Sequence, residues 1–224
     1  MEYKFSPSIM CSKPWDVLTY VRQFESCGID LIHYDVMDGN FVPNIMLGTG
    51  EYKDVHEVTD IPLDLHLMCI NPDVAVDYFD VKDNDRVCFH PQTIDDPYTL
   101  LKKIKSKGAH AGLAFNPKYP LDDIEKFKDQ IDFVLLMSVE PGFAGQKILP
   151  DAFEKIQKAA KLKDNLKMDL DIMVDGNCNP ENVKKMISSG ANQFVIGSAL
   201  LNNNNQANNF TNDYEKYKQE IGID

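Results

Sequence analysis

The sequence has no apolar run long enough to cross a membrane and no close pair of cysteines. No stretch approaches the roughly 18 apolar residues that a span requires, and the first residues, MEYKFSPSIM, lack the apolar segment of a signal peptide. The cysteines are odd in number, scattered and without a C-x-x-C pair: Cys11, Cys27, Cys69, Cys88 and Cys178. These absences argue against a disulfide framework and predict a reduced, cytoplasmic protein without membrane contact.

Basic residues are also in short supply. The chain has 23 lysines and arginines against 35 aspartates and glutamates, a net charge of −12. This balance argues against a nucleic acid or a membrane surface as partner, since both favour basic patches. It does not exclude a small phosphorylated substrate, which responds to the local field of its pocket. With 224 residues and 43% hydrophobic composition, we expect a single domain over residues 1–224.

Short apolar runs alternate with longer amphipathic ones along the whole chain. The eight candidate strands are FSPSIM, LIHYDVM, PLDLHLM, DRVCFH, HAGLAF, DFVLLMSV, DIMVDG and QFVIGS. Helical spacing is found between them in WDVLTYVRQFESC, YTLLKKIKSK, DAFEKIQKAAKLK and ENVKKMISS. Three of these helices reach a glycine suited to a left-handed C-cap, namely Gly28, Gly108 and Gly190.

Strands that are each followed by a helical stretch predict an α/β fold of the (β/α)₈ TIM barrel type. A doubly wound open sheet is the alternative, although it more often has fewer strands. The asparagine-rich segment LNNNNQANNF is interpreted as a surface linker to a last helix around Tyr214.

Polar residues occupy strand positions that alternation places inside the barrel. Residues two apart share a strand face, so His33, Asp35 and Met37 point the same way. The same rule pairs His66 with Met68 and Met173 with Asp175, all near the carboxyl ends of their strands. Barrels concentrate their chemistry at that end.

Two imidazoles and two carboxylates at one barrel mouth form a candidate site for one divalent cation, with Zn²⁺, Fe²⁺, Mn²⁺ and Co²⁺ all compatible. Taken singly, each histidine is more simply a satisfied core residue, and each aspartate a cap or the partner of an arginine. Their joint occurrence on three strand faces favours the metal. Asp38 falls on the opposite strand face and is left out of the ligand set.

The other histidines carry less weight. His56 lies in a polar helical stretch and is expected to face solvent, His90 ends its strand and could line the mouth, and His110 belongs to the opposite end. Met37, Met68 and Met137 take corresponding places on three strands. They fit ordinary core filling or a polarizable, water-poor collar around a reactive anion.

A phosphate site is expected at three turns. The segment EPGFAGQK, residues 140–147, contains glycines that let its backbone approach a ligand. DGN at 175–177 and GSA at 197–199 follow the seventh and eighth strands, whose loops often bind phosphate in barrels.

Six motifs together resemble the ribulose-phosphate 3-epimerase family over nearly the whole chain. They are SPSIM, HYDVMDGNFVPN, DLHLM, LLMSVEPGFAGQ, MVDG and IGSAL, and they occur in the family's order. The resemblance implies a ribulose-phosphate-binding barrel with one divalent cation held by His33, Asp35, His66 and Asp175. It also implies that Asp35 and Asp175 are the acid and base.

The resemblance further implies which residues contact the sugar phosphate. Beyond the metal ligand His66 these are Ser8, Met37, Met68, Met137, Gly142, Phe143, Ala144, Gly145, Gly176, Asn177, Gly197 and Ser198. Two departures bear on the substrate: VDGN stands where the family usually has V-D-G-G, and PGFAGQ where it has P-G-F-G-G-Q. Both forms, and H-P-x-T after the fourth strand, resemble the allulose-6-phosphate 3-epimerase branch, whereas LLMSVEPGF and GSALL resemble the ribulose branch.

The implied reaction inverts C3 of a 2-ketose phosphate through an enediolate. Inversion needs one proton-handling group on each face, and Asp35 and Asp175 come from well-separated strands. A metal-dependent decarboxylase or aldolase is a rival, but no lysine shares the inward faces of the strands that carry the four ligands. A non-catalytic sugar-phosphate sensor would not need all four ligands. Barrels of this type usually self-associate, so a homo-oligomer is expected.

Overall fold

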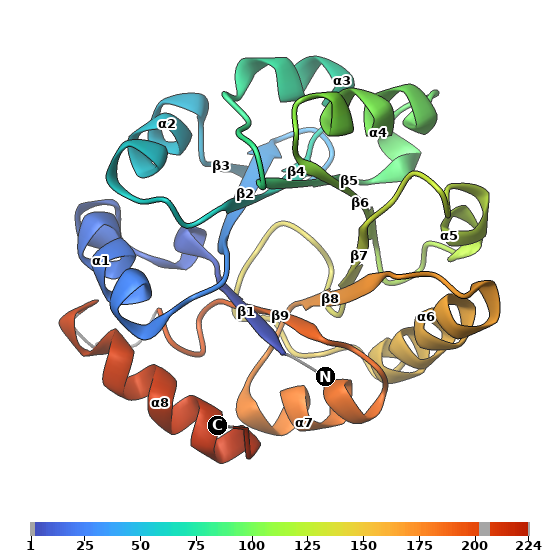
Figure 1. The fold of residues 1–224 in the computed structure, drawn as a ribbon. Helices are drawn as coiled ribbons and strands as arrows, with labels where there is room; N and C mark the ends of the chain where they lie inside the picture. The colour runs from blue at the N-terminus through green and yellow to red at the C-terminus, as the bar shows by residue number, and fades with distance from the viewer. Residues whose placement is uncertain (1–2, 202–206, 224) are drawn as a thin grey trace.

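In the computed structural model, which describes residues 3–201 and 207–223, a parallel sheet curls into a cylinder surrounded by helices (Figure 1). Each of the eight predicted runs overlaps one barrel strand. These are β1 (Lys4–Pro7), β2 (Ile32–Asp38), β4 (Leu63–Met68), β5 (Arg86–Phe89), β6 (His110–Phe115), β7 (Phe133–Met137), β8 (Asp171–Asp175) and β9 (Gln193–Ile196).

The sheet runs in the order β1-β9-β8-β7-β6-β5-β4-β2, and a parallel bridge between Ser8 and His33 joins β1 to β2. The cylinder is therefore closed, and the predicted (β/α)₈ barrel is confirmed. This closure brings the carboxyl ends of β2, β4 and β8 to the same rim.

The helices lie outside the sheet. They are α1 (Val17–Cys27), α2 (Thr49–Val58), α3 (Pro72–Ala75), α4 (Pro97–Ser106), α5 (Asp122–Lys126), α6 (Ala152–Leu166), α7 (Pro180–Ser188) and α8 (Phe210–Ile221). The four segments predicted as helical from their spacing form α1, α4, α6 and α7. Gly28, Gly108 and Gly190 all have positive φ, as a left-handed helix end requires. Half of the asparagine-rich segment predicted as a linker, residues 202–206, lies outside the described residues, whereas the expected last helix is α8.

Two features differ from the predicted pattern. A short strand, β3 (Ile45–Met46), pairs antiparallel with Met37 and Asp38 at the rim, and two residues are too few to show alternation. The helices α3 and α5 contain only four and five residues, so the segments after β4 and β6 are mostly turns.

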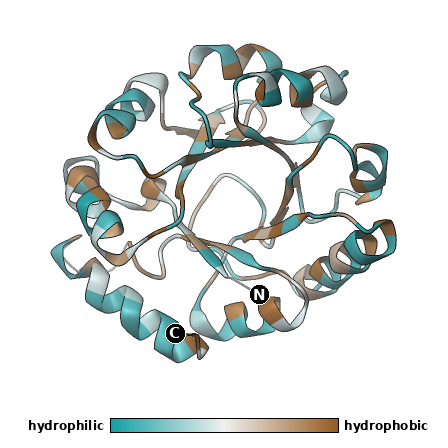
Figure 2. Cartoon of the chain, viewed as in Figure 1, coloured by the Kyte–Doolittle hydropathy of each residue, from teal (hydrophilic) through white to brown (hydrophobic). Residues whose placement is uncertain are grey.

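The two faces of each strand build two separate apolar layers. One face packs against the helices, as Leu65, Phe89 and Phe115 do. The other face fills the cylinder with a smaller cluster, which includes Ala114, Leu135 and Met173. Figure 2 shows brown apolar segments on the strands and alternating brown and teal segments along the helices. The cylinder is thus a packed core, and a ligand can enter only at its ends.

The side chain of His56 is largely buried, and the prediction that it faces solvent was wrong. Its side chain is 6% exposed, and its Nε2 lies 3.0 Å from Oδ2 of the buried Asp85. Asp85 also accepts hydrogen bonds from the Tyr52 hydroxyl and the Leu63 main-chain N–H. His56 lies one helical turn after Tyr52, and this face of α2 meets Asp85. His110 lies at the amino end of β6, as predicted, and it is exposed there.

In the described part of the chain, no helix combines the length and the apolar character needed to cross a bilayer.

Candidate active site

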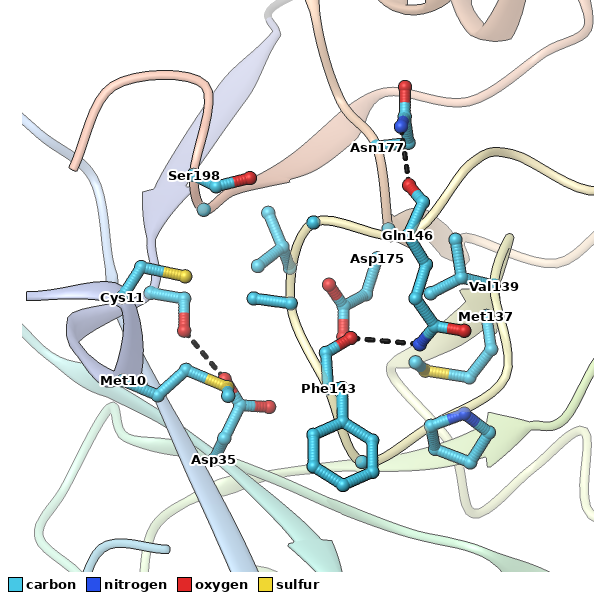
Figure 3. A pocket seen from close by; sticks show the side chains of 18 of the residues that line it. Met10, Cys11, Asp35, Met137, Val139, Phe143, Gln146, Asp175, Asn177 and Ser198 are labelled. Atoms are coloured by element: carbon cyan, nitrogen blue, oxygen red, sulfur yellow. Dashed lines mark hydrogen bonds between the residues drawn. The ribbon is translucent and has the colours of Figure 1, made fainter. Parts of the chain in front are cut away.

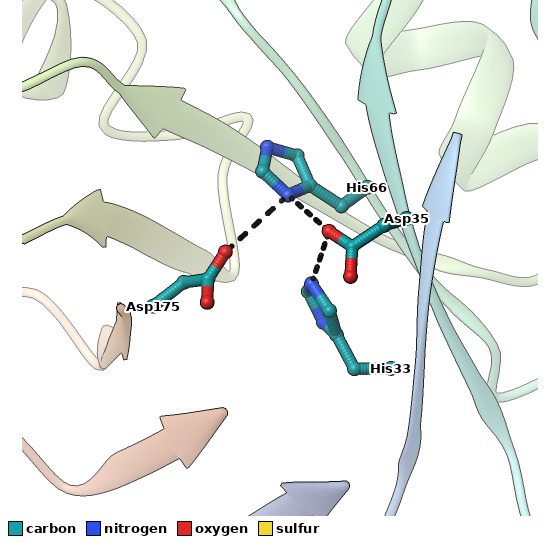
Figure 4. A group of neighbouring side chains, drawn as sticks. All are labelled: His33, Asp35, His66 and Asp175. Atoms are coloured by element: carbon teal, nitrogen blue, oxygen red, sulfur yellow. Dashed lines mark hydrogen bonds and ion pairs between the residues drawn. The ribbon is translucent and has the colours of Figure 1, made fainter. Parts of the chain in front are cut away.

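Four side chains from three strands converge at the carboxyl end of the barrel (Figure 4). β2 supplies His33 and Asp35, β4 supplies His66, and β8 supplies Asp175. One ligand atom from each lies within 4.8 Å of the others. The alternation rule therefore predicted their common direction correctly, and the register of β2 with β4, which sets Asp35 beside His66, brings them together.

The donor set of this cluster fits a divalent cation. It offers two imidazole nitrogens and two carboxylate oxygens, which suit Zn²⁺ and first-row transition metals. The Nδ1 atom of His66 is buried without a hydrogen-bond partner, although it lies 3.3 Å from Asp35 Oδ1. A buried polar atom left unpaired is costly in a folded protein, and a cation among these four groups would satisfy it.

Each histidine of the cluster has a buried partner behind it. His33 Nδ1 lies 2.6 Å from Asp64 Oδ2, so this nitrogen carries the proton and Nε2 faces Asp35 with its lone pair when the ring is neutral. His66 Nε2 lies 2.9 Å from His90 Nε2. Such outer contacts fix the orientation and tautomer of metal-binding imidazoles.

The electrostatic environment separates the two aspartates. Burial and the neighbouring Asp35 raise the pKa of Asp175 to about 6. Burial alone would also raise the pKa of Asp35, but the imidazoles of His33 and His66 outweigh it and hold this pKa below its usual value. Without a bound cation, Asp35 is therefore a carboxylate at neutral pH, while Asp175 holds a proton more readily.

Above this cluster lies a pocket of about 260 Å³ (Figure 3). Nearly all of the predicted substrate contacts line it: Ser8, Met37, Met68, Met137, Gly142, Phe143, Ala144, Gly145, Gly176, Asn177, Gly197 and Ser198. His66 is the exception, because it is fully buried beneath the floor. Asp35 and Asp175 reach the pocket from the floor, so these two carboxylates and the predicted phosphate turns share one cavity.

Sequence reasoning missed several residues of this region. Met10 and Cys11 also line the pocket, while Asp64 supports His33 from behind. Asp64 lies two residues before His66, so the alternation rule could have placed it on the same inward face. His90, expected near the mouth, is fully buried behind His66.

Asp38 lies apart from the cluster, as predicted. Its carboxylate accepts hydrogen bonds from the main-chain N–H groups of Asn40, Phe41 and Ile70. These donors outweigh burial and lower the pKa of Asp38. The residue therefore holds the turn after β2.

Gly176 allows the turn after β8 to pack closely. Its φ is +115°, and an added Cβ would lie 2.7 Å from both Ser138 Oγ and Val139 Cγ2. A larger residue here would push the β7 and β8 ends apart. The glycine thus brings the turn that contains Asn177 against the 140–147 loop.

Residues 4–201 match the sequence profile of the ribulose-phosphate 3-epimerase family. The chain belongs to this family. Curated relatives named ribulose-phosphate 3-epimerase include those of Bacillus subtilis, 39% identical over 88% of this chain and 91% of the relative, and of Methanocaldococcus jannaschii, 37% identical over 88% and 84%. The Escherichia coli enzyme is 33% identical over 89% of both chains. The protein is therefore a homologue of ribulose-phosphate 3-epimerases, which are isomerases.

Solved structures extend the likeness to more distant barrels. A mutant tryptophan synthase α-subunit from Pyrococcus furiosus aligns over 100% of both chains with a TM-score of 0.71 and 15% identity. A thiamine phosphate pyrophosphorylase from the same organism aligns over 98% of this chain and 96% of its own, with a TM-score of 0.62 and 17% identity. At such identity the likeness shows the fold alone, and it agrees with the barrel seen in this member of the epimerase family.

Proposed function

We propose that the protein is a metal-dependent ketose-phosphate 3-epimerase that interconverts D-ribulose 5-phosphate and D-xylulose 5-phosphate. The observation that carries the proposal is the placement of Asp35 and Asp175 in one pocket floor, on strands from well-separated parts of the barrel and with pKa values displaced in opposite directions. Inversion at a carbon next to a carbonyl needs such a pair, one group to take a proton and another to give one.

His33, Asp35, His66 and Asp175 would hold one Zn²⁺, Fe²⁺, Mn²⁺ or Co²⁺ ion. When bound, this ion supplies Lewis-acid stabilisation of the negative charge that develops at the C2 oxygen. The chain's own contribution is orientation. Asp64 holds the His33 ring from behind, and the Ser8 hydroxyl donates to Asp35 Oδ2 at 2.6 Å.

Asp35 and Asp175 handle the protons. The ionised carboxylate removes the C3 proton from one face of the substrate, and the protonated one delivers its proton to the opposite face of the planar enediolate. Reversal of the reaction exchanges the two roles. The pair starts each turnover with one proton between them.

The walls of the pocket would exclude water from the reacting carbon. Met37 and Met68 pack with Val42 in one apolar cluster at the rim, and Met137 lines the pocket from β7. An apolar lining strengthens electrostatic interactions inside the site. The methionines thus favour the charged intermediate without donating a proton to it.

The phosphate would bind at the turns after β7, β8 and β9. No lysine or arginine is among the described residues that line the pocket, so the available donors are main-chain N–H groups and neutral side chains such as the Ser198 hydroxyl. Glycine-containing turns commonly serve this purpose in barrels. The sugar's carbonyl end then lies toward Asp35 and Asp175.

Two substrates compete for this assignment. The relatives described above are named as ribulose-phosphate 3-epimerases, which favours ribulose 5-phosphate. The VDGN and PGFAGQ turns favour D-allulose 6-phosphate, whose conversion to D-fructose 6-phosphate is the same inversion on a sugar one carbon longer. We favour the ribulose assignment, in a cytoplasmic homo-oligomer.

The deciding experiment measures kcat/KM for both sugar phosphates side by side, with Mn²⁺ or Zn²⁺ added to chelator-stripped protein. We expect a higher value for ribulose 5-phosphate, loss of activity in the stripped protein, and solvent deuterium at C3 of the product. A higher value for allulose 6-phosphate would reassign the substrate. Product without deuterium would contradict the mechanism with two carboxylates. Full activity after stripping would show that the reaction needs no bound metal.

A further inference from the structure

The loop at residues 140–147 is held by carboxamide side chains that all bind its carbonyl groups. Asn44 Nδ2 donates to Gly142 O at 2.8 Å, and Gln146 Nε2 donates to Glu140 O at 2.6 Å and to Phe143 O at 2.8 Å. Asn177 Nδ2 donates to Gln146 O (Figure 3). Four carbonyls of the loop are thus occupied by amide donors.

The N–H groups of the same loop are unused. Within residues 3–201 and 207–223, no main-chain N–H from 142 to 147 donates a hydrogen bond. Carbonyls repel an anion and N–H groups attract one. Occupied carbonyls and available N–H groups therefore give this segment, which lines the pocket, the polarity that a phosphate needs.

Asn177 connects this loop to helix α7. Its Oδ1 accepts from Asn179 Nδ2 at 2.9 Å and from Asn182 Nδ2 at 2.7 Å, while its Nδ2 reaches Gln146 O. Both polar atoms of the side chain are therefore engaged within the protein. Its φ is +49°, in the left-handed region that asparagine and glycine tolerate.

We propose that Asn177 is a positioning residue whose carboxamide ties the 140–147 loop to the start of α7 and keeps the loop's N–H groups available to the phosphate of the substrate. This refines the predicted role of Asn177 as a substrate contact: the side chain acts through the loop. The proposal rests on the proposed function for the identity of the anion, a sugar phosphate.

The principal variant is Asn177→Gly, because glycine keeps the positive φ and removes only the side-chain bonds. We expect KM for ribulose 5-phosphate and the dissociation constant of inorganic phosphate to rise about tenfold, equivalent to about 1.4 kcal/mol. The value of kcat should stay within about twofold, because bonds lost equally in ground and transition states raise KM alone.

A second variant tests whether Asn177 acts through its anchor. Asn182 does not line the pocket and donates to both the side chain and the main-chain carbonyl of Asn177. Asn182→Ala should shift KM and phosphate affinity in the same direction by about threefold, the value of roughly one weak hydrogen bond. It keeps the proposal testable if Asn177→Gly does not fold.

The matched control is Asn192→Ala at the other end of the barrel. Asn192 Nδ2 donates to Asp171 Oδ1 and its Oδ1 accepts from Ile172 N, each at 2.7 Å. It should lower thermal stability without changing KM or phosphate affinity. KM and phosphate affinity unchanged in both Asn177→Gly and Asn182→Ala would overturn the proposal, as would a fall in kcat alone.

Calorimetry with inorganic phosphate separates this proposal from the assigned reaction. Wild-type protein that binds phosphate but epimerises neither sugar phosphate would refute the proposed function. The positioning role would still stand if Asn177→Gly weakened that binding. Conversely, the wild-type protein could be an active epimerase while Asn177→Gly and Asn182→Ala bind phosphate as tightly as it does. That result would support the proposed function and refute the role of Asn177.

Discussion

The two ends of the barrel bury charge in opposite ways. At the amino end, the chain supplies its own cation: Arg86 Nη1 donates to Gln193 Oε1 at 2.5 Å and to Asp171 Oδ2 at 3.4 Å, and the guanidinium lies 3.9 Å from the centre of the Phe133 ring. At the carboxyl end, Asp35 and Asp175 face imidazoles, and no lysine or arginine of the described residues lines the pocket. The acidic group at the amino end is paired with a cation of the chain, whereas the acidic groups at the carboxyl end fit an added cation.

This difference between the two ends can be seen in two aspartates of a single strand, β8. Asp171 and Asp175 lie on the same face of β8, four residues apart, at opposite ends of the barrel. Asp171 meets Arg86 and Asn192, so its charge has partners that the chain provides. Asp175 has a raised pKa and lines the pocket. The strand therefore offers a natural pair of positions for comparing the two ends.

The largest effect should follow from removing a carboxylate at the carboxyl end. We expect Asp175→Asn and Asp35→Asn each to lower kcat by about 10²–10⁴-fold, the range typical of general acid–base groups. The measurement is turnover of ribulose 5-phosphate at saturating Mn²⁺. Asp171→Asn on the same strand is the control and should keep kcat within about twofold, because its charge lies outside the pocket. Retention of a tenth of wild-type activity by either active-site variant would remove the two-carboxylate scheme.

A smaller effect, on stability alone, should follow at the amino end. Arg86→Met keeps much of the side-chain volume but removes the hydrogen bonds to Gln193 and Asp171 and the contact with Phe133. We expect the free energy of unfolding to fall by about 2–3 kcal/mol, with kcat/KM unchanged. Urea denaturation and the epimerase assay measure the two quantities. A matching loss of kcat/KM in well-folded protein would show that the ends are coupled, against the comparison above.

Much of this arrangement could be predicted from the sequence. Alternation placed His33 and Asp35 on one face of β2, and the helix-strand periodicity predicted the barrel that brings the carboxyl end of β8 to the same rim. Both rest on local spacing, which the printed sequence carries directly. The joint occurrence of the four side chains on inward strand faces favoured a metal site, and the shared family motifs then implied that Asp35 and Asp175 are the acid and base.

Contacts between distant segments were not predictable in the same way. His56 was assigned to solvent because its helix is polar, yet its partner Asp85 lies 29 residues away. The support of His33 by Asp64 depends on how far one strand is shifted against its neighbour, which alternation does not fix. The side chain of Asn177 likewise bonds to Gln146, which is 31 residues away in the sequence and comes close only in the folded protein.

The support behind His33 gives a third, intermediate test. Asp64→Asn keeps an acceptor near His33 Nδ1 but removes its charge, so the ring becomes a weaker ligand. We expect the affinity for Zn²⁺ or Mn²⁺ to fall about 10–100-fold, measured by competition with a chelator. His110→Gln, at the exposed amino end of β6, is the control and should leave metal affinity unchanged. Equal affinity in Asp64→Asn and wild type would mean that the buried contact only fills space.

The smallest expected effect is a gain in stability when a carboxyl group of the pocket is replaced. The pKa of Asp175 is raised from 3.8 to about 6, so ionising this carboxyl costs the native state stability as pH rises through that window. In chelator-stripped protein, Asp175→Asn should therefore be more stable than wild type at pH 7.5. We expect a gain of about 1–2 kcal/mol, allowing for partial solvent exposure of the carboxyl. The difference should shrink as the pH falls from about 6 to below about 3, where the wild-type carboxyl is protonated in both the native and the unfolded state.

Adding Mn²⁺ should reverse this sign. The cation binds the wild-type ligand set in the native state and stabilises it by mass action, whereas the asparagine variant lacks one charged ligand. Thermal unfolding at pH 7.5, with and without Mn²⁺, measures both signs in one experiment. Arg86→Met should lower thermal stability by the same amount with and without Mn²⁺, because the cation at the amino end is a side chain of the protein itself. If stripped wild-type protein were as stable as stripped Asp175→Asn across this pH range, the carboxyl end would hold no uncompensated charge, and the contrast between the two ends would fail.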